Sequence, residues 1–219
     1  MFLLGIDTCG PSGSVALSRL TAGQSAEIIA QENLEGRTYS ATLVSAVQEL
    51  LEGQEIGLSN IGCIVVVNGP GSFTGVRVGL SAAKGLGEGA GIPIVAVSRL
   101  EVLARLAGSR GAALDAHRHE VFLRVADPEP RELLAGVEEL ARITSASSIA
   151  ICDDTAAALL GRVWPAVDLL RVAAPTAADA LAVAAPHVSA GNFADVALLD
   201  GHYLRRSDAE IFGNTVAKS

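Results

Sequence analysis

The run IGCIVVV, residues 61–67, limits the choice of fold more than any other segment, because it has no charged or strongly polar side chain. A strand with one face in water alternates polar and apolar residues. This run therefore predicts a strand inside a sheet that is covered on both faces. A second buried strand, IPIVAVS at 92–98, follows, and helical patterns lie before and after it. Strands that alternate with helices predict an α/β fold, with a mixed sheet and helices packed on it.

Two segments share a pattern in which an apolar strand ends on an aspartate, a short turn follows and a second strand returns. In the first, Asp7 ends FLLGI and the turn TCGPSG leads into SVALSRL; in the second, Asp115 ends AAL and the turn leads into EVFLRV. The repetition predicts two related lobes with a boundary near Gly108. We therefore expect an N-terminal lobe at 1–107 that carries the partner-binding helices, and a smaller, divergent lobe at 108–219.

Each of the two aspartates has two interpretations, and the residues leave both open. A short acidic side chain often caps its own turn by accepting hydrogen bonds from backbone N–H groups. Alternatively, Asp7 and Asp115 face each other across a cleft between the lobes. Actin-like and hexokinase-like ATPases use such an arrangement to organise a metal ion and the phosphates of ATP.

The segment NGPGSFTG, residues 68–75, joins the buried strand to a helix predicted over 76–89. A helix N-terminus presents free N–H groups that favour an anion, and Ser72 or Thr74 can serve as the N-cap. The segment matches neither G-x-x-x-x-G-K-[ST] nor G-x-G-x-x-G, and it lacks the lysine that contacts terminal phosphates. Any nucleotide binding is therefore expected to be weak or vestigial, with Asp7, Gly71, Ser72 and Asp115 as the candidate residues.

Small residues recur at every fourth position along this helix, at Gly75, Gly79, Ala83, Gly87 and Gly91. Glycine within a helix costs up to about 1 kcal/mol relative to alanine, so the pattern predicts close approach of another backbone. That backbone can belong to the protein's own sheet or to a partner, and both can hold because a helix has two sides. A second helix, predicted over 39–51, carries one apolar stripe. The candidate partner-interface residues are Leu43, Val47, Leu50, Gly79, Ala83 and Gly87.

Composition narrows the class of function. The formal net charge of -8 and the pI near 5.0 disfavour RNA binding by this chain alone, because nonspecific affinity needs lysine and arginine opposite the phosphates. No apolar run is long enough to cross a bilayer and the N-terminus has no basic signal region, so a cytoplasmic protein without membrane contact is expected. Neither the widely spaced cysteines nor His117 and His119, two residues apart, form a local metal motif.

Four segments of the sequence resemble the bacterial TsaB (YeaZ) family of tRNA threonylcarbamoyladenosine biosynthesis proteins. They are LGIDTCGPSGSVAL, VVNGPGSFTGVRVGLSAAKGLG, IPIVAVSRLEVLA and ALDAHRHEVFLRV. The most specific motif is GPGSFTGVR, Gly69 to Arg77. The resemblance is dense from Met1 to about Val125 and thin afterwards, where GHYLRR, Gly201 to Arg206, is similar to the family's ending. It implies the actin-like ATPase (ribonuclease H-like) fold, with two lobes of mixed sheet and flanking helices.

The resemblance also implies a function. It points to a noncatalytic scaffold or activator that dimerises with the catalytic paralogue TsaD, which holds a metal through two histidines. A small ATPase, TsaE, joins the pair, and the complex transfers threonylcarbamoyl to the adenosine beside the anticodon. The chain would then need no cofactor of its own, would meet tRNA only through the complex, and could form a homodimer when alone. Family pairing uses the N-lobe helices, here 39–51 and 76–89.

Two other functions remain as alternatives at this point. The chain could be an actin-like ATPase in its own right, binding ATP and magnesium through the two aspartates and the loops at 9–13 and 69–75. A peptidase is suggested by old names of relatives, but no set of nucleophile, base and orienting group is visible in the sequence. The chain also departs from the family at Arg37 to Ser40, ahead of the first helix, and at the turn His117 to His119. These departures concern the partner contact and the cleft, respectively.

Overall fold

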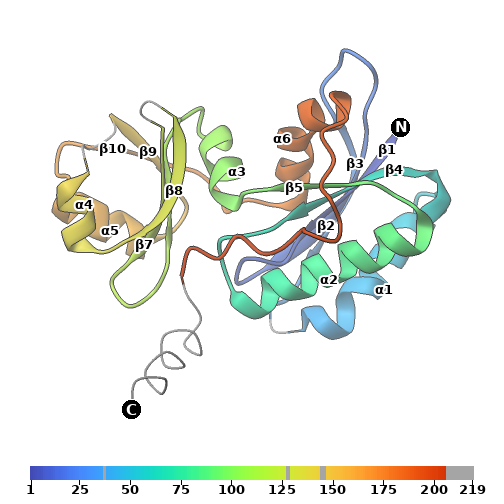
Figure 1. Ribbon diagram of the computed structural model, residues 1–219, viewed down its shortest axis with the longest axis horizontal. Coiled ribbons are helices and arrows are strands. Elements are labelled where there is room, and N and C mark those ends of the chain that lie inside the picture. Colours follow the sequence, from blue (N-terminus) through green and yellow to red (C-terminus); the bar gives the residue numbers. More distant parts are fainter. Residues whose placement is uncertain (37, 127–128, 144–146, 206–219) are drawn as a thin grey trace.

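The structure is a computed structural model that describes residues 1–36, 38–126, 129–143 and 147–205. It contains two five-stranded sheets of the same design (Figure 1). The first has the order β3-β2-β1-β4-β5, and the second, read in the same direction, has the order β8-β7-β6-β9-β10. The strands are β1 (Phe2–Asp7), β2 (Gly13–Arg19), β3 (Glu27–Leu34), β4 (Ile61–Val67), β5 (Ile94–Val97), β6 (Ala112–Asp115), β7 (Val121–Ala126), β8 (Pro130–Ala135), β9 (Ser148–Ile151) and β10 (Asp168–Arg171).

In each sheet the first three strands form an antiparallel meander, and the last two lie parallel to the first. The aspartates Asp7 and Asp115 occupy the same place in the two sheets, at the end of the central strand where the meander turns. This repetition confirms the predicted α/β fold with two lobes of mixed sheet and flanking helices.

The helices are α1 (Tyr39–Glu52), α2 (Phe73–Ala90), α3 (Arg99–Leu106), α4 (Val137–Arg142), α5 (Asp154–Val163) and α6 (Ala177–Ser189), with a short 3-10 helix at Leu58–Asn60. Figure 1 shows α1 and α2 on one face of the first sheet and α6 on the other. The strand β4 is buried along almost its whole length, as its uniformly apolar sequence predicts. None of the helices in the described part of the chain is long and apolar enough to span a membrane.

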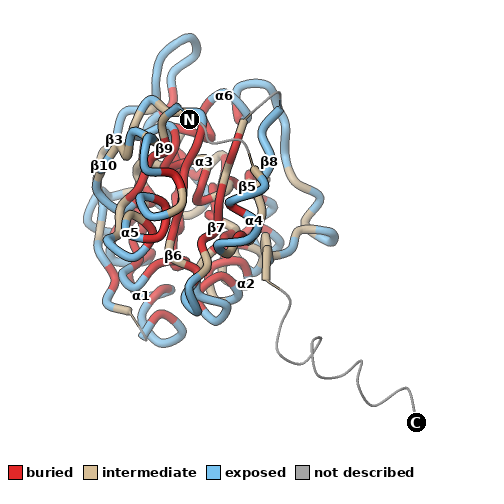
Figure 2. The backbone as a smooth tube through the Cα atoms, turned by 90° about the vertical axis from the view of Figure 1, so that its left-hand side faces the viewer, coloured by how far each residue is buried: buried red, intermediate tan, exposed pale blue. Residues whose placement is uncertain are grey.

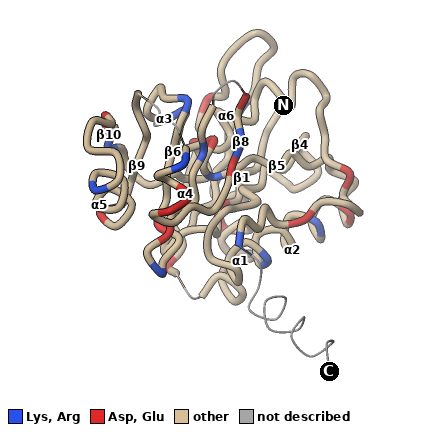
Figure 3. Tube along the Cα trace, turned by 60° about the vertical axis from the view of Figure 1, so that its left-hand side comes forward, with Lys and Arg blue, Asp and Glu red and all other residues tan. Residues whose placement is uncertain are grey.

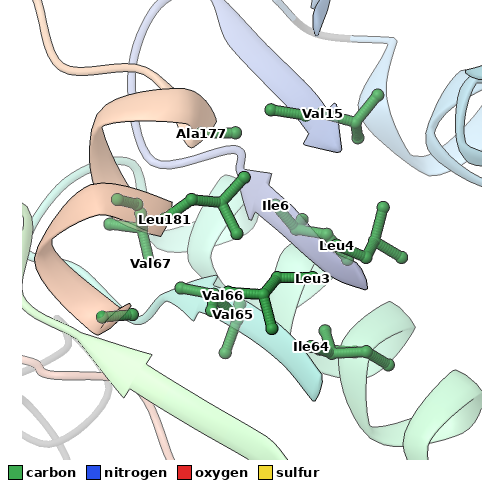
Figure 4. Close-up of a cluster of buried hydrophobic side chains, with 14 of the residues drawn as sticks. Leu3, Leu4, Ile6, Val15, Ile64, Val65, Val66, Val67, Ala177 and Leu181 are labelled. Carbon is green, nitrogen blue, oxygen red and sulfur yellow. The ribbon is translucent and has the colours of Figure 1, made fainter. Parts of the chain in front are cut away.

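The last helix, α6, does not pack in the lobe to which the predicted division at 1–107 and 108–219 assigns it. The second sheet ends with β10, and α6 then returns to the first sheet, where Ala177 and Leu181 pack among the side chains of β1 and β4 (Figure 4). The physical reason is that β1 and β4 are apolar on both faces, while α1 and α2 cover only one. A side chain at Gly5 would collide with the Ala177 carbonyl and Leu181, so glycine there lets α6 approach closely.

The helix α3 connects the two lobes. Its residues Leu100, Leu103 and Ala104 pack with the buried side chains of the second sheet, while Val102 belongs to the core of the first. Figure 2 shows that the buried segments run through both lobes. Because α3 starts directly after β5, its first residue lies where the two lobes meet.

The sequence did not predict β8, α4 and α5 and misplaced some boundaries. α2 begins at Phe73 rather than at residue 76, and Ser72 is its N-cap, with Ser72 Oγ accepting a hydrogen bond from Gly75 N at 3.3 Å. The strand β10 lies at 168–171 and ends on the first residue of the run RVAAP at 171–175. All of the missed elements lie in the second lobe, whose elements are short.

Candidate functional site

The candidate site lies where the β1–β2 turn, the loop before α2 and the start of α3 meet. Asp7 is only 1% exposed, and its Oδ1 accepts a hydrogen bond from Cys9 N at 2.8 Å. Its other carboxylate oxygen, Oδ2, lies 3.8 Å from Nε of Arg99, the first residue of α3. Arg99 is also buried, at 6% exposure. The site is therefore a buried ion pair rather than an open carboxylate.

Backbone hydrogen bonds, and the absence of a side chain at Gly10, fix the position of Arg99. The Arg99 N–H donates to the Gly69 carbonyl at 2.7 Å, and Ser98 caps the helix by accepting from Leu100 N. A Cβ at Gly10 would collide with the Arg99 guanidinium, so the guanidinium lies directly under the β1–β2 turn. Arg99 Nε has no hydrogen-bond partner among the described residues.

Burial sets the protonation behaviour of the groups around Asp7. It raises the pKa of Asp7, and the attraction of Arg99 and the Cys9 N–H only partly offset this, while Asp179 on α6 pushes in the same direction as burial. Burial also raises the pKa of the Cys9 thiol well above its ordinary value, which the charge of Asp7 reinforces. Tyr39 closes the turn from α1 by donating from its hydroxyl to the Gly10 carbonyl at 2.9 Å.

The glycine loop before α2 packs directly on the β1–β2 turn. Side chains at Gly71 and Gly75 would collide with the carbonyl groups of Cys9 and Thr8, respectively. Ser72 N donates to the Cys9 carbonyl at 2.8 Å, and Thr8 Oγ1 donates to the Gly75 carbonyl at 2.7 Å. The loop glycines therefore permit close backbone contact within the chain.

The second aspartate is engaged in its own turn. Asp115 Oδ1 accepts from His117 N at 2.8 Å, and Oδ2 lies 3.0 Å from His117 Nδ1. The backbone N–H of Asp115 donates to Asp153 Oδ2 at 3.0 Å. Both Asp7 and Asp115 thus cap their own turns. Among the described residues no three His, Cys, Asp or Glu side chains are gathered in a way that could hold a metal ion.

The six candidate interface residues on α1 and α2 all face inward. Leu43, Val47 and Leu50 are 2 to 4% exposed and lie in the core of the first lobe. Ala83 is fully buried, and added side chains at Gly79 and Gly87 would meet Thr8 and Ile94. The protein's own sheet and turn supply the close approach that the small residues predict. All six residues are therefore buried within this chain.

The opposite faces of the same helices are open. Val44 on α1 is 61% exposed. Added side chains at Gly85 and Gly89 on α2 would meet nothing within 4 Å. Although Val44 belongs to the apolar stripe of the first predicted helix and Gly85 lies near the small residues of the second, none of these three residues is among the six interface candidates predicted from the sequence.

Sequence reasoning also missed Arg99 and Tyr39. The available signal for Arg99 was its position directly after the buried strand IPIVAVS. Charged residues are rarely buried, so a charged side chain at such a place indicates a specific partner. The hydroxyl of Tyr39, at the start of the predicted helix, gave no such signal. Only the folded chain brings it to the turn at Gly10.

The chain is similar in sequence to several known proteins. A family model described as "TsaD: tRNA N6-adenosine threonylcarbamoyltransferase" matches residues 27–135. The tRNA threonylcarbamoyladenosine biosynthesis protein TsaB of Haemophilus influenzae is 36% identical over 126 residues, which are 55% of this chain and 51% of that protein. TsaB of Escherichia coli K12 is 34% identical over 128 residues, 56% of this chain and 53% of that protein. The alignments thus span about half the length of these curated relatives.

The solved structures extend the likeness to almost the whole chain. A Pseudomonas aeruginosa protein described as similar to peptidase YeaZ superimposes with a TM-score of 0.74 at 28% identity, covering 93% of this chain and 99% of that one. A second structure, YeaZ from the same organism, has a TM-score of 0.70 at 26% identity. The chain is thus similar, in sequence and in structure, to proteins of the TsaB (YeaZ) family. The central local feature of its candidate site is the buried pair of Asp7 and Arg99 at the end of β1.

Proposed function

We propose that this chain is a noncatalytic subunit in the biosynthesis of threonylcarbamoyladenosine in tRNA, and that it acts by dimerising with the catalytic paralogue TsaD. The observation that carries the proposal is the match to TsaB proteins at 34 to 36% identity together with the whole-chain match to YeaZ structures. The match of residues 27–135 to the TsaD family model supports descent from a common ancestor with that paralogue. The small ATPase TsaE would join the pair.

The chemistry of the candidate site supports a role without catalysis. A catalytic carboxylate or thiol needs access to substrate and a suitable pKa. Asp7 and Cys9 are both 1% exposed, and burial raises the pKa of each. Figure 3 shows Lys and Arg interspersed with Asp and Glu along the trace, and the net charge is -8. A subunit of this charge would meet tRNA through the complex rather than grip it alone.

The open faces of α1 and α2 are the proposed contact with the paralogue. Two helical glycines, Gly85 and Gly89, each cost up to about 1 kcal/mol relative to alanine. Neither has a neighbour in this chain that requires the absence of a side chain. Close approach of a partner backbone to these helices, one of which carries the exposed Val44, would explain why glycine occurs at both positions. In the isolated protein the same faces could pair with a second copy.

The test combines light scattering after size-exclusion chromatography with a tRNA modification assay, using this chain, the catalytic paralogue and both. The expected result is a one-to-one complex, with modification requiring both proteins. Gly85→Leu and Val44→Asp should weaken the complex. Gly161→Leu on α5 and Val137→Asp on α4 are matched controls, because Gly161 also has no neighbour within 4 Å and Val137 is also exposed.

Two outcomes would contradict the proposal. Modification that proceeds at full rate without this chain would exclude an activating role. ATP turnover by the isolated chain that is lost in Asp7→Asn, with no complex formed, would establish the alternative of an ATPase in its own right.

A further inference from the structure

We propose that the Arg99 guanidinium is the permanent counterion of Asp7, and that it stands in the place where the fold implies a metal ion and phosphates, so that this chain binds neither magnesium nor a nucleotide at Asp7. The inference concerns the ligand state of the chain and does not depend on which protein it pairs with. It also decides between the two interpretations of Asp7 that the sequence leaves open.

The first argument is the disagreement between the fold and its residues. The actin-like ATPase fold implies ATP and magnesium at the carboxylate that ends β1. In this chain one oxygen of that carboxylate accepts the Cys9 N–H, and the other faces Arg99 Nε at 3.8 Å. A metal ion needs several oxygen ligands, but the described residues around Asp7 offer a guanidinium instead. The residues present therefore do not fit magnesium and a nucleotide.

The second argument is that Arg99 cannot withdraw easily. Its backbone N–H donates to the Gly69 carbonyl, and its guanidinium lies under the turn at Gly10. A side chain at position 10 would collide with the guanidinium. Tyr39 bonds the same turn from outside at the Gly10 carbonyl. An arginine guanidinium stays charged at all accessible pH values, so the turn is closed over a fixed positive charge.

The third argument is the electrostatic balance around Asp7. The charged or titratable groups that face it are Arg99 from α3, Cys9 on the turn, Tyr39 from α1 and Asp179 from α6. Arg99 is the only cation among them. Without it, a carboxylate that is 1% exposed would be left with no positive charge beside it, which is a strongly unfavourable arrangement. A proton would then have to replace the guanidinium.

The experiment measures thermal unfolding of the full chain and of two variants. In the wild-type protein, millimolar Mg²⁺ with or without ATP should leave the melting temperature unchanged. Arg99→Ser should lower it at pH 7 by roughly 10 °C, and a shift to acid pH should restore part of the loss. In the double variant Asp7→Asn with Arg99→Ser, acid should not have this effect, because the carboxylate at position 7 is gone.

Several results would overturn the inference. One is a wild-type melting temperature that rises with Mg²⁺ and ATP and no longer does so in Asp7→Asn. Another is an Arg99→Ser variant whose melting temperature responds to pH no differently from that of the wild type. If Arg99→Ser fails to fold, the double variant decides: recovery of folding supports the charge pairing, and continued failure shows that Arg99 acts by packing alone.

Discussion

The hydroxyl of Ser98 lies 2.6 and 2.8 Å from the two carboxylate oxygens of Glu132, and it joins the N-cap of α3 to the second sheet. The same carboxylate is 2.7 Å from Arg124 Nη1 and 2.9 Å from His202 Nε2. His202 in turn donates its backbone N–H to the Asn68 carbonyl beside the glycine loop. One buried glutamate thus connects both lobes and the segment that follows α6.

The first prediction is that Glu132→Gln unfolds more readily than the wild type near neutral pH. Burial alone would raise the pKa of Glu132, but hydrogen bonds from His202, Ser98 and Arg124 outweigh it and hold the pKa below its ordinary value. A carboxyl group with a lowered folded-state pKa stabilises the protein above its unfolded pKa, and this contribution is lost as the pH falls through the folded pKa.

Urea unfolding at a series of pH values measures this effect. The variant should lose roughly 1–3 kcal/mol of unfolding free energy at pH 7, and the difference from the wild type should shrink below about pH 4. Glu138→Gln is the control, since its ion pair with Arg142 is exposed and worth little. A pH-independent difference for Glu132→Gln would show that packing rather than charge is responsible.

The second prediction separates the two sides of α2. Gly79→Leu should destabilise the isolated chain by several kcal/mol, because a side chain there would collide with Thr8 Oγ1 inside the first lobe. Gly85→Leu should leave the stability unchanged or slightly raised, since leucine has the higher helix propensity and the site is open. Equal losses in both variants, measured by urea unfolding, would contradict the assignment of the two faces.

Much of the fold could be predicted from the sequence, because in some segments a single structural requirement determines the residue pattern. The run at 61–67 is apolar because β4 is covered on both faces, and the two turns after Asp7 and Asp115 recur because the sheets repeat. The return of α6 to the first sheet could not be predicted. Its alanine-rich sequence suits either lobe, and the choice depends on which sheet face is left uncovered.

The candidate site could be predicted only in part. Asp7 and the glycine loop do meet, but their partner, Arg99, comes from an element distant in the sequence. The period of four in α2 correctly indicates close backbone approach, yet it cannot say whose backbone approaches. Open positions such as Gly85 break the regular period, so pattern analysis passes over the residues that are free to meet another protein.

The third prediction concerns the cluster at the start of α2. The Arg77 guanidinium lies 3.8 Å over the Phe73 ring, and the rings of Phe73 and Tyr203 are 5.0 Å apart. Tyr203→Ala should remove about 0.5–1.5 kcal/mol of aromatic and cation–π stabilisation. Hydrogen exchange should then become faster at the His202 N–H, which bonds the Asn68 carbonyl.

The matched variant for that test is Tyr203→Phe. It keeps the ring and loses only the contact between the tyrosine hydroxyl and Arg77 Nε at 3.4 Å, which is long for a hydrogen bond. It should therefore behave like the wild type. If it exchanges as fast as Tyr203→Ala, the hydroxyl rather than the ring holds the segment in place.

The fourth prediction is that all three thiols are inert while the chain is folded, which separates this protein from a cysteine peptidase. Burial raises the pKa of Cys63 to about 11, raises that of Cys9 well above its ordinary value and also raises that of Cys152. Because the thiolate is the reactive form, a disulfide reagent at pH 8 should modify the native protein slowly and all three cysteines quickly in denaturant. The half-exposed Cys152 is expected to react first of the three. Fast modification of Cys9 in the native state would mean that the β1–β2 turn opens, and it would contradict the closed site around Asp7 and Arg99.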